Sequence, residues 1–153
     1  MKKKTGAISA PDTGQFKLRL KSLNLKATPQ RVAVHEAMLE LVHATADMVC
    51  EHIAATSKTR ISAASVYNIL SAMADLGIYA RRFNAGSKMW FDVNTFRHLH
   101  AYDSVSDTFL DIFDDTLAGA VEDILKRKRI RGYRIDRIDV QLICSPTRRK
   151  PKK

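Results

Sequence analysis

Two histidines near the middle of the chain, His98 and His100, have the residue type and spacing that suit metal binding. They form an H-x-H pair between two carboxylates, Asp92 and Asp111. The surrounding residues are rich in types that favour β-strands. In an extended strand both imidazoles would leave the same face, about 6.6 Å apart. The pattern therefore predicts a cation site with a carboxylate from each flank, and an ordinary surface-strand histidine doublet is the alternative.

The donor types restrict both the cation and the chemistry. Imidazole suits iron, zinc and copper, while carboxylate extends the choice towards manganese. A hydrolytic or oxygenase metal centre would also need an open coordination position beside a concave pocket. The sequence has no evident nucleophile, glycine-rich phosphate loop or second catalytic cluster. We therefore expect a binding protein and not an enzyme.

Charge and cysteine content indicate the kind of partner. The 153-residue chain carries a net charge of +10, which favours a polyanion, most often nucleic acid, over anionic membrane or plain solubility. No apolar run is long enough to cross a membrane, and no apolar core follows the basic N-terminus, so we expect no membrane span and no export signal. Cys50 and Cys144 are too isolated for a disulfide framework, which favours the cytoplasm. A basic interaction module without a metal is an alternative class.

Residues 1–14 have little periodicity and are expected to form a disordered basic arm. After them, cap residues followed by apolar positions at spacings of three and four indicate helices. The expected helices run over 16–25, from Thr28-Pro29 to residue 42, from Thr45 to about residue 56, and from Ser62 or Ser65 to Gly77.

The period then changes to two, which predicts a hairpin. Its strands would be 78–84 and 87–94, joined at Ala85-Gly86. Three helices followed by a hairpin is the plan of a winged helix-turn-helix, whose last helix lies in the major groove. On that helix Tyr67 and Asn68 could meet base edges or methyl groups, with Ser65 beside them. Alternatively, Tyr67 and Asn68 are ordinary solvent-facing residues.

The remaining chain predicts a β-β-α-β unit. Its expected elements are the H-x-H strand, a strand over 108–113, a helix over 116–129 and a strand over 133–143. A unit this small buries too little apolar surface to be stable alone, so we expect it to pack against a second copy. A two-fold dimer would present two recognition helices to a palindromic DNA site. The expected fold class is α+β, with domains 15–94 and 95–144 and a basic tail, 145–153.

Four short runs of residues carry a resemblance to a known family. They are TPQR (28–31), H-x-T-A (43–46), S-x-A-S-V-Y-N-x-L (62–70) and FD…H-x-H…LDI (91–112). Together they resemble the Fur family of metal-responsive bacterial repressors, over about residues 16–143. The S-V-Y-N run, the missing cysteines and GYRIDRIDV (132–140) look most like the Irr branch, the iron response regulators. The peroxide-sensing PerR branch shares Y-N and the acidic residue at Asp92.

The resemblance implies a sensory metal site between two domains. Its ligands would be His43, Asp92, His98 and His100, with Asp111 near this metal or a neighbouring one. The implied ion is Fe²⁺, Mn²⁺ or Zn²⁺. The Irr resemblance adds haem as a second effector, with a histidine of the H-x-H pair as axial ligand. An exposed loop histidine at position 43 and a solvated strand acid at position 111 are the alternatives for those two residues.

The resemblance also implies contacts to double-stranded DNA. Lys26 would enter the minor groove and Tyr67 the major groove, and Asn68 stands where many Fur proteins have an arginine. Arg31 and Ser65, which lie in the matching runs, complete the expected DNA-binding set.

Two departures from the family pattern narrow the function. Asp103 and Ser106 stand where many members have the first C-x-x-C of a structural zinc, and Cys144 has no nearby partner, so we expect no structural zinc held by four cysteines. Val32 replaces the histidine that PerR-like proteins oxidise. The expected function is a homodimeric DNA-binding regulator, mainly a repressor, of iron- or haem-related genes. A PerR-like peroxide- or manganese-responsive repressor is the alternative.

Overall fold

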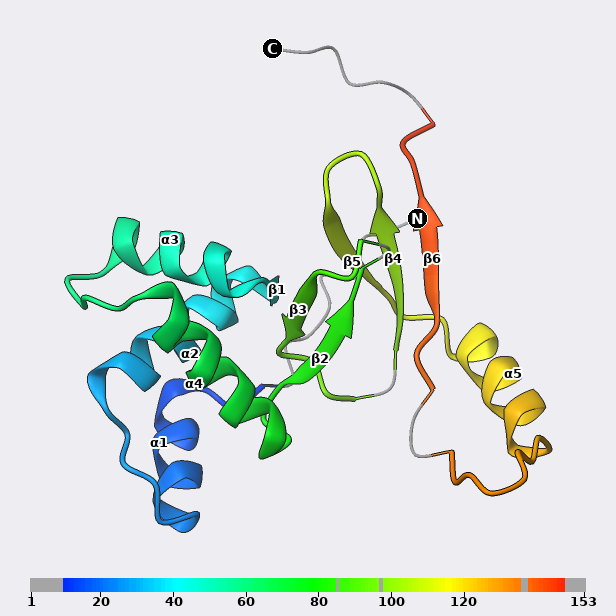
Figure 1. The fold of residues 1–153 in the computed structure, drawn as a ribbon, viewed down its shortest axis with the longest axis horizontal. Helices are drawn as coiled ribbons and strands as arrows, with labels where there is room; N and C mark the ends of the chain where they lie inside the picture. Colours follow the sequence, from blue (N-terminus) through cyan, green and yellow to red (C-terminus); the bar gives the residue numbers. More distant parts are fainter. Residues whose placement is uncertain (1–9, 85, 97, 136–137, 148–153) are drawn as a thin grey trace. The chain divides into compact units, whose positions relative to one another are not determined.

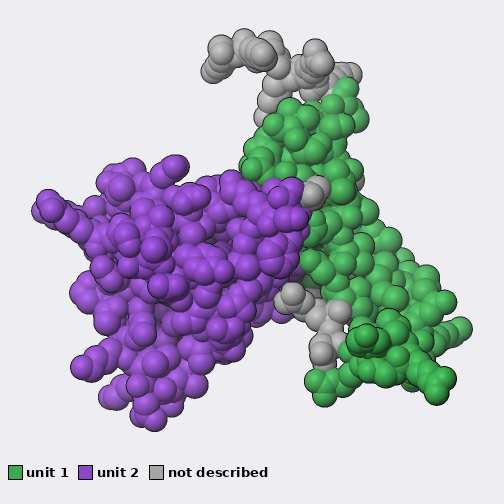
Figure 2. Space-filling view, in the orientation of Figure 1, with its two compact units in different colours: residues 1–6, 97–153 green, residues 7–96 purple. Residues whose placement is uncertain are grey.

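The computed structural model describes residues 10–84, 86–96, 98–135 and 138–147. The described residues divide into an N-terminal unit, up to residue 96, and a C-terminal unit, from residue 98 onwards (Figure 2). Each unit has its own three-stranded sheet (Figure 1). The mixed helix and strand content confirms the predicted α+β class. The division falls after Phe96, two residues beyond the expected boundary.

The N-terminal unit begins with helices that start at hydroxyl or carboxylate caps. They are α1 (Thr13–Ser22), α2 (Pro29–Leu41), α3 (Ala46–Thr56) and α4 (Ala63–Asp75). The side chains of Thr28, Thr45 and Ser62 each accept a hydrogen bond from a backbone N–H three residues later. Ser62, and not Ser65, therefore caps α4, and Gly77 follows its end with a φ of 69°.

The first helix begins earlier than predicted. Asp12 and Gln15 form a capping box, because each side chain accepts a hydrogen bond from the other residue's backbone N–H. The helix therefore includes Thr13 and Gly14, which were assigned to the disordered arm, and that assignment was wrong for them. Residues 1–9 of the arm lie outside the described residues.

The hairpin consists of β2 (Ala80–Phe83) and β3 (Met89–Asp92), paired antiparallel. Asn84 closes its turn by accepting hydrogen bonds from the backbone N–H groups of Gly86 and Lys88. Ala85, expected within the turn, lies outside the described residues. A further strand that the periodicity did not predict, β1 (His43–Ala44), pairs with the other edge of β3.

The core of the N-terminal unit joins all four helices to the sheet. The largest fully buried apolar side chains in it are Phe16, Leu20, Val34, Met38, Ile53, Leu70, Met73, Ile78 and Phe91. Cys50 is half-buried beside this cluster, with its Sγ 3.6 Å from the carbonyl oxygen of Ile61, as expected of a small packing residue.

One imidazole, that of His35, is fully buried in this core. Its Nε2 donates to the carbonyl oxygen of Pro11 at 2.7 Å, and its Nδ1 lies 2.8 Å from the hydroxyl of Tyr79. The ring of Phe16 stacks on it at 3.9 Å. Burial lowers the pKa of His35, opposed by the Pro11 hydrogen bond and then by Glu36 and Asp12. The neutral imidazole therefore accepts from Tyr79, whose own pKa burial raises.

We expect the stability of the N-terminal unit to fall as the pH drops below about 6.5. The lowered pKa of His35 means that the unfolded chain binds more protons than the folded one between the two pKa values. The stabilisation is complete above the unfolded pKa and is lost as pH falls towards the folded one, with a slope of at most about 1.4 kcal/mol per pH unit for one proton. Urea unfolding at several pH values measures this slope.

His35→Gln should reduce that slope, because it removes the buried imidazole whose pKa is lowered. A folded His35→Gln variant with the slope of the parent would contradict the assignment to His35.

The C-terminal unit has the predicted β-β-α-β order. Its elements are β4 (Leu99–Asp103), β5 (Thr108–Ile112), α5 (Asp115–Lys126) and β6 (Gln141–Cys144). Strand β4 is central, antiparallel to β5 and parallel to β6. Helix α5 is capped by Asp114 and ends three residues before the predicted end.

The last strand is shorter than the predicted 133–143. Only residues 141–144 pair with β4, opposite residues 100–103. Among the described residues before them, Tyr133 makes an isolated bridge to Ile130, and residues 138–140 are not in a strand. Asp136 and Arg137 lie outside the described residues, as do residues 148–153 of the expected tail. Alternation alone overestimated the strand because a strand also needs a neighbour to pair with.

Candidate metal centre and nucleic-acid interface

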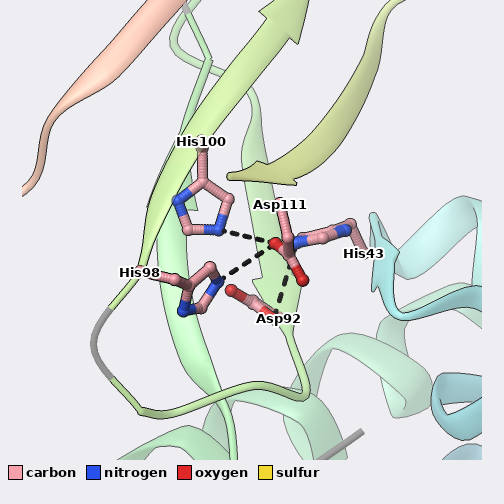
Figure 3. A group of neighbouring side chains, drawn as sticks. All are labelled: His43, Asp92, His98, His100 and Asp111. Atoms are coloured by element: carbon pink, nitrogen blue, oxygen red, sulfur yellow. Dashed lines mark ion pairs between the residues drawn. The ribbon is translucent and has the colours of Figure 1, made fainter. Parts of the chain in front are cut away.

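The short strand β1 positions the first pair of candidate ligands, both in the N-terminal unit. His43 is the direct antiparallel partner of Asp92 on β3, and its Nε2 lies 3.6 Å from Asp92 Oδ1 (Figure 3). Val42 turns the chain from α2 into β1 with a φ of 62°, an uncommon conformation for a β-branched residue. Both side chains are buried, His43 at 8% exposure and Asp92 at 0%.

Asp92 has further contacts within the same unit. Arg82 Nε lies 3.2 Å from its Oδ2, and the backbone N–H of Asn94 donates to its Oδ1 at 2.8 Å. Arg82 was not among the predicted site residues. The hairpin register could have indicated it, because Ala80 lies opposite Asp92 and Arg82 follows two residues later on the same face.

The second group of candidate ligands belongs to the C-terminal unit. His100 on β4 is the direct partner of Asp111 on β5, with Nε2 3.2 Å from Oδ1. His98, just before β4, places its Nε2 3.0 Å from the same oxygen (Figure 3). The two imidazole rings are 4.3 Å apart, and neither histidine side chain is exposed. Phe109 and Phe113 lie against them, with centroids 6.0 and 5.9 Å away.

These distances fit donors that share a divalent cation. Two ligands at about 2.1 Å from one ion are about 3.0–3.5 Å apart in octahedral or tetrahedral geometry. The observed separations within each unit are 3.0, 3.2 and 3.6 Å. Buried imidazoles facing carboxylates therefore fit the chemistry of an ion of the Fe²⁺, Mn²⁺ or Zn²⁺ type.

The residues expected to read DNA bases lie on α4. Tyr67 is 44% exposed, and its ring meets that of Phe91 edge-on at 6.3 Å, while Asn68 is also exposed. Ser65 lies in the first turn, where its hydroxyl is 3.0 Å from that of Ser62. Tyr67 and Asn68 are therefore available to a partner, and the Ser65 hydroxyl already takes part in the cap.

The other two residues expected to contact DNA, Lys26 and Arg31, lie around the start of α2. Lys26 is exposed in the loop before this helix. Arg31 Nη1 donates to the carbonyl oxygen of Lys26 at 2.7 Å, so its guanidinium fixes the loop that carries Lys26. Gln30, which was not singled out, ties the same helix to the α3–α4 connection by donating to the carbonyl oxygen of Arg60 at 3.0 Å.

Asp103, the last residue of β4, and Ser106, in the β4–β5 turn, are the residues on which the predicted absence of a four-cysteine zinc site rests. Asp103 Oδ1 accepts from the backbone N–H groups of Val105 and Ser106, at 2.9 and 3.4 Å. The carboxylate thus closes the turn with hydrogen bonds.

Among the described residues, no helix combines the length and apolar character needed to cross a membrane.

Comparisons with known proteins place this fold. The ferric uptake regulator of Vibrio cholerae is similar at a TM-score of 0.71 and 22% identity, and the match covers 86% of this chain and 99% of that one. The ferric uptake regulator of Pseudomonas aeruginosa with manganese is similar at a TM-score of 0.65 and 19% identity, with 86% and 98% covered. The ferric uptake regulator of Helicobacter pylori, described with three functional metal binding sites, is similar at a TM-score of 0.68 and 15% identity, with 88% of each chain covered. At such identities they show the fold alone.

A sequence comparison identifies the family directly. No curated protein sequence matches the chain significantly. Residues 22–142, however, match the model of the Ferric uptake regulator family. Members of this family are DNA-binding, dimer-forming transcriptional regulators and not enzymes. Because this match covers most of the chain, it shows that the chain belongs to the ferric uptake regulator family.

Proposed function

We propose that the chain is a cytoplasmic, homodimeric transcriptional regulator, mainly a repressor, that binds a palindromic operator in response to one divalent cation. As in the Irr branch, its targets would be iron- or haem-related genes. The observation that carries the proposal is the spacing of the buried donors, 3.0–3.6 Å within each unit, which suits ligands of a shared ion. The cation would be Fe²⁺, Mn²⁺ or Zn²⁺.

Both groups of donors would bind the same cation. The N-terminal unit provides His43 and Asp92, and the C-terminal unit provides His98, His100 and Asp111. Neither group alone provides the four to six ligands that these ions usually take. Six Cα–Cα steps separate Asp92 from His98, so the covalent chain limits their separation to about 22 Å.

The bound ion would supply a fixed link between the unit that reads DNA and the unit that dimerises. The histidines must be neutral and the carboxylates ionised to bind it, so occupancy should decrease as pH falls through the histidine range. The link would favour the spacing of two recognition helices that matches successive major grooves. The ion can shift the equilibrium between the two spacings of the recognition helices only by as much as its affinities for the two differ.

Haem is the competing effector. A histidine of the H-x-H pair would be an axial ligand, but a porphyrin also needs a large apolar slot. His98 and His100 have no exposed side-chain surface and lie between Asp111 and two phenylalanine rings. This packing favours a single ion.

Titrating a labelled palindromic operator with the protein plus Fe²⁺, Mn²⁺, Zn²⁺ or haem, each separately, tests the proposal. If the affinity for the operator is the same with each of the four effectors as it is without any effector, the proposal is refuted.

Exposed apolar residues support the homodimer. Leu110 on β5 and Leu142 on β6 flank Ala101 on the same face of the sheet, and they are 60% and 40% exposed. Exposed apolar side chains in this unit also include Val105, Phe113, Leu117, Ile124, Ile130, Tyr133, Ile135, Ile138 and Ile143. A surface this apolar is typical of a protein–protein interface.

Leu110→Asp should convert the dimer to a monomer. A carboxylate at a buried apolar interface loses its hydration without gaining a partner, which weakens association by several kcal/mol. Sedimentation velocity measures the change. Leu18→Asp is the matched control, because Leu18 is 69% exposed in α1 of the other unit. A dimer that survives Leu110→Asp, or dissociates equally in Leu18→Asp, would contradict this interface.

A further inference from the structure

We propose that Arg82 is a built-in counter-ion of Asp92 that competes with the regulatory cation and so sets the cation concentration at which the site fills. The inference rests on the proposed metal-dependent function. It concerns a residue of the N-terminal unit that is not itself a ligand.

The sheet register places Arg82 permanently beside the ligand. In the β2–β3 pair Ala80 lies opposite Asp92 and Arg82 opposite Trp90, so Arg82 is the diagonal neighbour of Asp92 on the same face. Its Nε lies 3.2 Å from Asp92 Oδ2. The side chains are 13% and 0% exposed, which leaves little room for water between them and the surrounding core.

The contact places a fixed positive charge beside a buried carboxylate. A buried carboxylate without a compensating charge is strongly destabilising. An arginine stays protonated at any physiological pH. The Arg82 guanidinium contacts Oδ2 of Asp92, and the Asn94 backbone N–H donates a hydrogen bond to Oδ1.

The same contact opposes cation binding. The His43 side of the carboxylate is Oδ1, at 3.6 Å from the imidazole, while Arg82 contacts Oδ2. A cation on Oδ1 and the guanidinium on Oδ2 would be positive charges a few ångströms apart across one carboxylate. Their repulsion is poorly screened where so little surface is exposed. Arg82 cannot lose its charge, so the affinity of the site is lower than its donors alone would give.

The neighbouring arginine provides a matched control. Arg81 precedes Arg82 on β2 and faces the other side of the sheet, where its Nη1 lies 2.7 Å from Asp75 and its Nη2 donates to the carbonyl oxygen of Ser71 at 2.8 Å. Its replacement removes the same charge from the same strand, at a side chain that faces the other side of the sheet from Arg82 and Asp92.

The test compares Arg82→Gln, Arg81→Gln and the parent in the full chain. Zn²⁺ and Mn²⁺ dissociation constants are measured by competition with a chelating dye, and Tm is measured with and without each ion. Arg82→Gln should bind both ions about tenfold more tightly or better. It should also unfold at a lower temperature without the ion and gain more from adding it. Arg81→Gln should keep the parent dissociation constants.

Arg82→Lys covers the case in which the glutamine variant fails to fold, because it keeps a positive charge. It should bind the ions within a few-fold of the parent, while unfolding at a similar temperature. Unchanged or weaker ion binding in Arg82→Gln, or tighter binding in Arg82→Lys than in the parent, would overturn the inference. A parent that binds neither ion would instead refute the proposed function, and the inference with it.

Discussion

Replacing both His98 and His100 with alanine should abolish the response to the effector. The double variant loses two of the three imidazoles in the proposed site, and both face Asp111 Oδ1, at 3.0 and 3.2 Å. Loss of a group that merely supports a ligand already reduces metal affinity about 10- to 100-fold, so loss of two ligands should reduce it by more. The dissociation constant and the metal-dependent affinity for operator DNA should change together.

Two comparisons separate this effect from a loss of structure. His52→Ala removes an imidazole that pairs with Glu40 at the surface, and it should leave the metal titration unchanged. Asp111→Asn keeps the shape of the side chain that both imidazoles face while removing its charge, and it should weaken metal binding in a folded protein. A double variant that binds metal as the parent does would remove His98 and His100 from the site.

DNA binding should depend steeply on salt. If a dimer neutralises about 6 to 10 phosphates, its affinity should drop roughly 10³- to 10⁵-fold between 50 and 200 mM salt. Lys26→Ala should weaken binding to operator and random DNA alike and flatten the slope, because the lost positive charge attracts DNA of any sequence. Tyr67→Ala should weaken operator binding more, because Tyr67 is exposed on α4 and positioned by Phe91.

The control for Lys26 is Lys126. This lysine lies at the end of α5 near Glu122 and Asp123, at 3.8 and 3.6 Å, and belongs to the unit proposed to dimerise. Lys126→Ala should leave the salt slope nearly unchanged. Affinity that does not vary with salt would count against DNA as the partner, and equal losses on both DNAs for Tyr67→Ala would contradict its role in reading bases.

Much of this protein could be predicted from local sequence. Thr28 and Thr45 are predicted caps, and Ser62 is one of the two predicted candidates for the cap of α4, since a cap depends on residues only three apart. The change from a period near 3.6 to a period of two located the hairpin and the H-x-H strand. The same alternation predicted that His98 and His100 share one face, and the β4–β5 register then places both of them beside Asp111.

What local pattern could not supply is pairing between segments far apart in the chain. A two-residue strand such as β1 has no period, so only the folded sheet places His43 opposite Asp92. The contacts of Arg82 with Asp92 and of Arg31 with a backbone carbonyl likewise depend on register and loop geometry. The last strand is short because only residues 141–144 pair with β4, although the alternating pattern begins before them. Residue types fixed which donors this chain has; the sheets, through their registers, decided which of them face one another.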